Sequence, residues 1–178
     1  MRGLRRTTRA AVLLLALAPA ACDLKPAVAP VVETDPLAGL GPGIHPVLVV
    51  AERGPESTRV ELYLKRVQVS AEVASFQGEL RYPAGSMKPA AVEFAPGTAG
   101  AWNEAVPGRL RFAAAAPGGV GDGPVLTLRF TGQSALTRES FTLAMEEVVA
   151  RDGFANVTRL VAAAAHPLLV RGAHAREP

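Results

Sequence analysis

The chain has 178 residues, of which 49% are hydrophobic and only 5% aromatic, and its single cysteine excludes a disulfide within the chain. This length suffices for one domain that buries roughly two-thirds of its surface, so folding requires neither a metal nor a disulfide. Four of the 19 basic residues lie in the first nine positions, which leaves 15 basic against 16 acidic residues elsewhere and excludes nucleic-acid binding on the basis of charge.

Residues 1–21 have the layout of a signal peptide that ends directly before Cys22. Four arginines precede an uncharged run, Ala10 to Ala21, that is rich in leucine and alanine. The run is shorter than the roughly 20 residues that a membrane-spanning helix needs. Residues 17–22, Leu-Ala-Pro-Ala-Ala-Cys, resemble a lipobox, the motif after which the cysteine is lipidated.

We therefore expect Cys22 to carry lipid and to anchor the exported protein to the cell envelope. Several acyl chains hold stably, since each buried methylene contributes about 0.8 kcal/mol. The alternative is an ordinary secretory signal beside an incidental cysteine. Asp23 resembles an inner-membrane retention signal of some enteric bacteria, but the sequence leaves open whether the inner or the outer membrane holds the anchor.

Proline, alanine and glycine dominate residues 22–46, without sustained apolar periodicity. Such a composition predicts a semi-extended tether. The folded domain is expected over residues 47–165. Residues 166–178 are expected to form a C-terminal tail that could contribute to a last strand.

Within the predicted domain, apolar and polar residues alternate in short runs. Alternation of this kind places one face of a strand in the core and the other in solvent. It predicts strands near residues 47–51, 60–65, 76–82, 109–114, 125–131 and 140–150, with a closing strand in Val157 to Ala165. In the strand at 140–150, Phe141, Leu143 and Met145 share one phase.

Glycine and proline clusters at residues 83–85, 96–97, 107–108 and 117–119 separate these runs, and no long helical segment interrupts them. Seven to nine short strands at this spacing predict an all-β fold, an antiparallel β-sandwich. The alternation itself fits an Ig-like and a jelly-roll sandwich equally well.

Several segments occur in a recognisable order. Residues 60–64 read Val-Glu-Leu-Tyr-Leu, Phe76 to Leu80 runs into Arg81-Tyr82-Pro83, residues 108–112 read Gly-Arg-Leu-Arg-Phe, and residues 123–130 read Gly-Pro-Val-Leu-Thr-Leu-Arg-Phe. With Asp152-Gly153 near the end, this order resembles the cohesin family over about Val47 to Val161. The resemblance implies a jelly-roll sandwich of about nine strands that binds calcium-loaded dockerin modules.

The sequence departs from that family where a partner would bind. Tyr82 is followed directly by Pro83, without the aspartate of the family's Tyr-Asp-Pro turn. Ser75 and Gln77 stand where dockerin-binding members tend to have Asn and Asp. The resemblance therefore transfers no partner-binding residue to this chain.

Catalysis requires reactive groups that converge, and the sequence shows no such group. His45, His166 and His174 lie in flanking segments, and the sole cysteine is expected to carry lipid. Calcium takes about six to eight oxygen ligands, and neither Gly121-Asp122-Gly123 nor the loop at Asp152 has alternating acids. We therefore expect no enzyme, no cofactor and no metal.

One strand presents a polar row that could recognise a partner, formed by Ser75, Gln77, Glu79 and Arg81. A second row could be basic, with Arg109, Arg111 and Arg129. Solvated outer faces of sandwiches commonly have the same composition, so both rows could also be simple surface.

Trp102 lies in a predicted long loop between Phe94 and Arg109. A tryptophan on a loop can stack on a sugar ring or anchor a protein partner. It can equally cap the core of the sandwich.

These observations predict a lipid-anchored, extracytoplasmic binding module that holds a protein partner, dockerin-like in kind, at the cell envelope. One alternative is a carbohydrate-binding module with a role in polysaccharide binding or catabolism. Another is a structural envelope lipoprotein without a separable ligand.

Overall fold

The structure is a computed structural model that describes residues 40–132, 140–162 and 169–170. All of them belong to one compact unit, Thr34–Pro178. The predicted signal peptide, Cys22 and most of the predicted tether lie outside the described residues.

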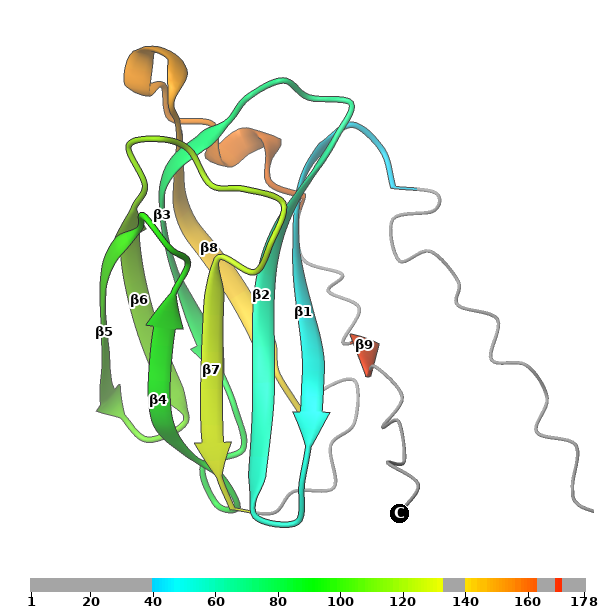
Figure 1. The fold of residues 1–178 in the computed structure, drawn as a ribbon, viewed down its shortest axis with the longest axis vertical. Coiled ribbons are helices and arrows are strands. Elements are labelled where there is room, and N and C mark those ends of the chain that lie inside the picture. Colours follow the sequence, from blue (N-terminus) through cyan, green and yellow to red (C-terminus); the bar gives the residue numbers. More distant parts are fainter. Residues whose placement is uncertain (1–39, 133–139, 163–168, 171–178) are drawn as a thin grey trace, which may run out of the picture. The chain divides into compact units, whose positions relative to one another are not determined.

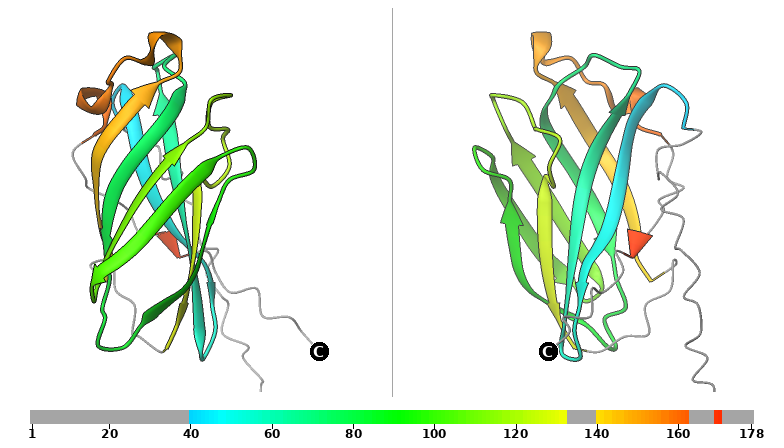
Figure 2. Two further views of the ribbon diagram at one scale, coloured as in Figure 1. Left: turned by 90° about the vertical axis from the view of Figure 1, so that its left-hand side faces the viewer. Right: turned by 45° about the vertical axis from the view of Figure 1, so that its right-hand side comes forward.

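The described chain folds into two facing β-sheets (Figures 1 and 2). The first has the strand order β4-β7-β2-β1-β9 and the second β5-β6-β3-β8. Neighbouring strands are antiparallel except for β9, which runs parallel to β1. The strands are β1 (Gly43–Arg53), β2 (Ser57–Val67), β3 (Val73–Arg81), β4 (Lys88–Phe94), β5 (Ala99–Val106), β6 (Arg109–Ala115), β7 (Leu126–Thr131), β8 (Thr142–Ala150) and β9 (Leu169–Val170).

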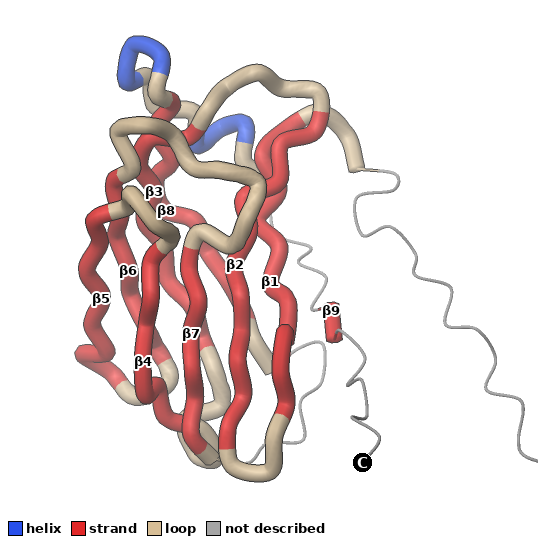
Figure 3. The backbone as a smooth tube through the Cα atoms, in the orientation of Figure 1, coloured by secondary structure: helices blue, strands red, loops and turns tan. Residues whose placement is uncertain are grey.

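The predicted antiparallel β-sandwich is thereby confirmed. Eight strands have six or more residues, and β9 has two. Figure 3 shows how little helix accompanies them: two single-turn 3₁₀ segments, η1 (Asp152–Phe154) and η2 (Thr158–Leu160), follow β8.

The core lies between the sheets and is built from the inward-facing residues that the alternation predicts. Leu62 on β2, Leu128 and Phe130 on β7 and Leu110 on β6 are fully buried. The Phe130 ring lies 5.0 Å from the Tyr82 ring, centroid to centroid. Burying each such side chain stabilises the fold by about 1.5–3 kcal/mol.

In β8 the predicted phase is only partly correct. Leu143 is buried, whereas Met145 is half-buried and burial resumes at Val148. The cause is a bulge, because the register of β3 against β8 shifts between Gln77 and Gly78. Gly78 allows the strands to approach here, since a Cβ at this position would lie 2.5 Å from the Ala144 carbonyl oxygen.

The predicted loop between Phe94 and Arg109 is wrong, because most of it is the edge strand β5. Its first residues, Ala99 to Ala101, have weak strand propensity. They become a strand through pairing with β6, where Ala99 lies opposite Ala115.

The two ends of the domain also differ from the sequence-based boundaries. β1 begins at Gly43, which pairs with Val67, so residues 43–46 belong to the sandwich rather than to the tether. The predicted closing strand in Val157 to Ala165 is wrong over its described part, residues 157–162. These residues form η2 and a single parallel bridge between Val161 and Ile44.

A partly buried contact fixes the β5–β6 hairpin to the turn after β3. The Tyr82 hydroxyl donates a hydrogen bond to the Glu104 carboxylate, which also accepts from the Gly108 amide at 3.1 Å. Gly108 has a φ of +84°, a left-handed conformation that favours glycine. The hairpin therefore holds a fixed position relative to β3, on whose sheet the candidate site lies.

Candidate partner-binding face

The outer surface of the sheet β5-β6-β3-β8 brings together most of the residues that the sequence singles out. We call it the open face, and it consists of the outward-facing residues of those four strands. Adjacent strands place equivalent residues in rows, for example Gln77 opposite Ala113, which in turn lies opposite Ala101.

One half of the open face is small and almost uncharged. Its alanines are exposed and its single serine half-buried, and together they cover neighbouring positions of three strands: Ala99, Ala101, Ala113, Ala115 and Ser75. Short side chains leave this half flat. A flat, rigid surface of this kind can be approached closely by another polypeptide.

The other half is charged, and its charged side chains form ion pairs with one another. Glu79 is only 7% exposed. Arg109 donates two hydrogen bonds to the Glu79 carboxylate, from Nη2 at 2.6 Å and from Nε at 3.2 Å. Arg81 adds a third from Nε at 2.9 Å. Bidentate pairs of this kind fix the orientation of both groups.

The arginines change the titration of this site. Hydrogen bonds from Arg109 and then from Arg81 lower the pKa of Glu79 from its ordinary value of 4.5 to about 2. The hydrogen bond with Glu79 in turn raises the pKa of Arg109. Glu79 is therefore an anion throughout the neutral and mildly acidic range, so that the charged row keeps its geometry there.

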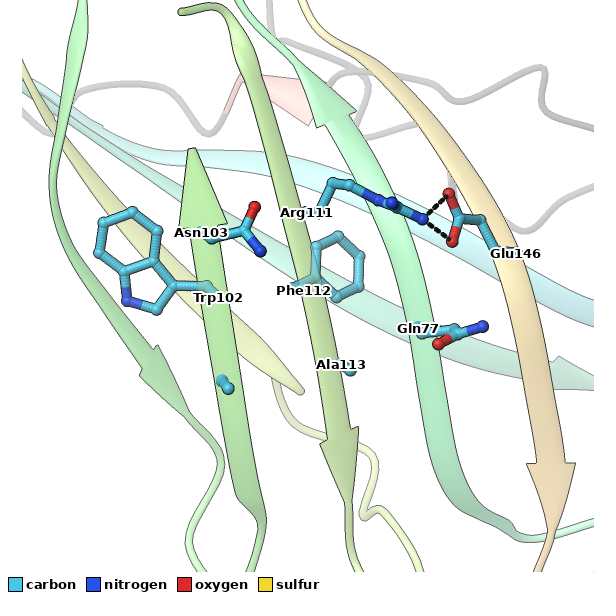
Figure 4. A pocket seen from close by; sticks show the side chains of 8 residues that line it. Gln77, Trp102, Asn103, Arg111, Phe112, Ala113 and Glu146 are labelled. Carbon is cyan, nitrogen blue, oxygen red and sulfur yellow. Dashed lines mark hydrogen bonds and ion pairs between the residues drawn. The ribbon is translucent and has the colours of Figure 1, made fainter. Parts of the chain in front are cut away.

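A second ion pair lies between strands. Arg111 Nη2 donates to both oxygens of Glu146, at 2.7 and 2.9 Å. Figure 4 shows this pair across β3, with Gln77 nearby, around a shallow hollow in the open face. The hollow lies where the small half meets the charged half.

Trp102 also lines this hollow, from the edge strand β5. It lies opposite Phe112, whose side chain faces the core, so Trp102 has the inward phase on an edge strand. The indole is 39% exposed. It points away from Gln77 and Arg111, beyond the edge strand β5 (Figure 4). It does not fill the core, and it borders the hollow at the edge of the sheet.

Sequence reasoning thus placed Ser75, Gln77, Glu79 and Arg81 on one face, as the structure does, but did not indicate that Glu79 is buried. The proposed basic row is wrong. Arg109 and Arg111 lie on the open face, whereas Arg129 lies on β7 in the other sheet, where its Nε is 3.7 Å from Glu93.

Glu146 and the alanines of β5 and β6 were missed. Alanine side chains carry no polar or aromatic group from which a binding role could be predicted in a sequence. The alternation in β8 would have placed Glu146 in the outward phase, but only the fold brings it to Arg111, which is 35 positions away in the chain.

His45 and Asp122 lie outside the open face. His45 is buried, with Nε2 2.8 Å from the Gly41 carbonyl oxygen. The Asp122 side chain is 94% exposed.

In the part of the chain that the structure describes, no three His, Cys, Asp or Glu side chains come together as a metal site. Among those same residues there is no helix with the length and hydropathy that a membrane span requires.

No protein-family model matches the chain, and no curated protein matches it in sequence. Solved structures do match in fold. The sixth cohesin of scaffoldin B from Acetivibrio cellulolyticus, solved with a Cel5 dockerin, is 12% identical with a TM-score of 0.53, and the match covers 74% of this chain and 100% of that one.

Two further structures agree. The cohesin of the Coh-OlpC-Doc435 complex from Clostridium thermocellum is 14% identical, with a TM-score of 0.52 and coverage of 74% of this chain and 90% of that one. A non-cellulosomal cohesin from the archaeon Archaeoglobus fulgidus is 18% identical, with a TM-score of 0.51 and coverage of 75% and 93%. The described domain therefore has a cohesin-like fold.

Proposed function

We propose that this domain is a protein-binding module that engages its partner through the open face. One observation carries the proposal. A flat, exposed half of the open face, formed by small residues, adjoins a half whose charged side chains are held in place by hydrogen bonds. Binding to such a surface requires little ordering of side chains, which lowers the entropic cost of association. The cohesins of Acetivibrio cellulolyticus and Clostridium thermocellum, which share this fold, were solved with dockerins, and this supports a dockerin-like partner here.

The charges on the open face favour a polar partner of mixed charge. Arg81, Arg109 and Arg111 balance Glu79, Glu146 and Glu147. A face without net charge attracts a charged partner only weakly at long range. We therefore expect the affinity to come from local complementarity and to vary little with ionic strength.

The test compares two alanines that are exposed on opposite sheets. Ala113 lies in the small half of the open face, and Ala90 is exposed on β4. Wild type, Ala113→Glu and Ala90→Glu are each immobilised and exposed to proteins from the producing cells and, separately, to a glycan array. We expect Ala113→Glu to weaken retention of a specific protein by roughly tenfold or more and Ala90→Glu to leave it unchanged.

Equal retention by both variants would place the binding surface elsewhere. Retention of glycans without any protein, reduced by Trp102→Ala, would instead establish the carbohydrate-binding alternative. Trp102 is the residue for that control because its indole is partly exposed at the edge of the sandwich.

We further propose that Cys22 is lipidated and holds this domain at the cell envelope through the tether. The signal-peptide layout and the lipobox-like residues 17–22 support this. Cys22→Ala should move the protein from the membrane fraction to the soluble fraction, still folded. Persistence of the variant in membranes washed with high salt would contradict a single lipid anchor.

A further inference from the structure

The strand β5 is an edge of the second sheet, and its outer side has no strand beside it. Within the described chain β5 pairs with β6 alone, and it is the leftmost strand in Figure 1. In an edge strand every second residue turns its backbone N–H and C=O away from the sheet, where they can pair with another chain. All residues of β5 except Glu104 are exposed, so this side of the strand is accessible.

Natural sheets protect their edges with proline, bulges, charged side chains or a covering segment. The other edges of this sandwich have such protection. Residues 155–158 run back along β8, where the Val157 amide donates a hydrogen bond of 2.8 Å to the Val148 carbonyl oxygen. β9 pairs with the outer side of β1. The edge strand β4 contains Pro89, which has no N–H, and its register against β7 shifts directly after it.

The regular part of β5 has none of these features. Residues 99–103 include no proline and no charged side chain. The one charged residue of the strand, Glu104, binds the Tyr82 hydroxyl and the Gly108 amide of its own domain. The register of β5 against β6 shifts only after Asn103. A regular, uncharged and exposed edge of this kind favours pairing with a further strand.

Trp102 extends past this edge. Its indole is 39% exposed and lies beyond β5 in Figure 4. Trp102 lies opposite Phe112 on β6, and no strand of the described residues lies on the other side of β5 to cover the indole. A strand added to β5 would lie about 4.8 Å from it and would bury this side chain. The edge therefore combines unpaired backbone with an exposed aromatic anchor.

The sequence of this edge is complementary to itself. When two copies of residues 99–103 pair antiparallel along their whole length, the twofold axis passes through the middle residue, Ala101. In this register Trp102 of each copy lies opposite Gly100 of the other. Directly opposite residues point to the same side of the sheet, so each indole covers a position that has no side chain.

The surroundings of Gly100 fit this arrangement. A Cβ at this position would lie 2.6 Å from the Phe94 ring, so the ring occupies the space of the missing side chain. An indole placed opposite Gly100 therefore meets an aromatic neighbour. In the same register Ala99 lies opposite Asn103 and Ala101 lies opposite itself. Like charges thus do not face each other across residues 99–103.

We propose that two copies of this domain pair through β5, antiparallel and with Ala101 on the twofold axis. The sheets β5-β6-β3-β8 of the two copies then form one continuous sheet. Both open faces lie on the same side of it, because the axis of an antiparallel pair is perpendicular to the sheet. One short strand buries less than the ~1,600 Å² of a standard interface, so we expect a dissociation constant in the micromolar range or weaker. The inference does not depend on what binds the open face.

Sedimentation equilibrium and fluorescence test the dimer in the full chain with Cys22→Ala, which removes the expected lipid. Trp102 is the only tryptophan, so its emission reports directly on the β5 edge. Between about 1 μM and 1 mM we expect a monomer–dimer equilibrium. The emission should shift to shorter wavelength as the dimer forms, because the indole leaves water. A chain that stays monomeric over this range, or a dimer with unchanged emission, would overturn the proposal.

Charges at position 101 test the register, because only there does a residue face its own copy. Ala101→Lys and Ala101→Glu should each raise the dissociation constant roughly tenfold or more, since like charges directly opposite are destabilising. An equimolar mixture of the two variants should restore the dimer. Ala90→Lys, on an exposed position of β4, is the matched control and should leave the constant unchanged. Equal constants for the two lysine variants, or a mixture that associates no more tightly than its components, would overturn the proposal.

A disulfide tests the same register without any charge. Ala101→Cys in the Cys22→Ala chain leaves one thiol per chain. Opposite Cα atoms of antiparallel strands lie about 4.5–5.5 Å apart, within the reach of a disulfide. Mild oxidation should therefore link two chains, whereas Ala90→Cys should stay unlinked. Equal linking of both thiol variants, or none of either, would overturn the proposal. If the charged variants do not fold, this crosslink decides alone.

Discussion

Val47 on β1 and Ala113 on β6 hold comparable places in the two sheets, since each points away from the core of the sandwich. Val47 is almost completely buried, whereas Ala113 is exposed. The outward neighbours of Val47 include the apolar Val49 and Tyr63, whereas those of Ala113 include Ala101, Ala115 and the ion-paired Arg111. Identical strand alternation therefore has two outcomes in this fold: Val47 on one outer face is buried, and Ala113 on the other is exposed.

The largest expected difference in stability comes from two single variants that place a charge at Val47 or at Ala113. Val47→Asp buries a carboxylate without a partner and should lower the free energy of unfolding by about 3 kcal/mol or more. Ala113→Asp should change it by less than about 0.5 kcal/mol. Urea unfolding of the two variants measures both values. Similar losses in the two would show that the outer faces do not differ in burial.

A milder change sharpens the same contrast. Val49→Ala removes two methyl groups from a site that is 5% exposed, and we expect a loss of about 2 kcal/mol. Val106→Ala is the matched control, because Val106 is 51% exposed, and it should cost at most about 0.5 kcal/mol. A large loss at Val106, or none at Val49, would contradict the difference in burial between the two valines.

The charged half of the open face should respond to pH. The pKa of Glu79 in the folded protein, about 2, lies below the ordinary value of 4.5, so its contribution to stability is complete above pH 4.5 and disappears as the pH falls towards 2. Wild type should therefore lose stability over that interval relative to Glu79→Gln. Thermal unfolding midpoints of both proteins across this range provide the measurement, and parallel curves would refute the role of Glu79.

The smallest effect is expected for the ion pair between Arg111 and Glu146. Both side chains are substantially exposed, at 58% and 35%. Arg111→Ala should therefore change the free energy of unfolding by no more than about 0.5 kcal/mol, while weakening partner binding because the group lies at the hollow of the open face. Loss of stability beyond that range would mean that the pair has a structural role rather than one in binding.

Much of the fold could be predicted because strand alternation is a local signal. Leu126, Leu128 and Phe130 point to one side of any strand they form, whatever lies beyond it. β5 was missed because its first residues are Ala-Gly-Ala, whose strand conformation comes from pairing with β6. The phase of β8 changes at a bulge, which depends on how closely β8 approaches Gly78 of β3.

For the candidate site, the sequence by itself determined that Ser75, Gln77, Glu79 and Arg81 share one side of a strand, because side chains alternate with a period of two. Only the tertiary structure decided that Arg109 reaches Glu79, that Arg111 reaches Glu146, and that Arg129 belongs to the opposite sheet. Only tertiary packing, likewise, distinguished Val47, which is buried, from Ala113, which is exposed. Periodicity fixes the direction in which a side chain points, whereas what it meets there depends on segments that are distant in the chain.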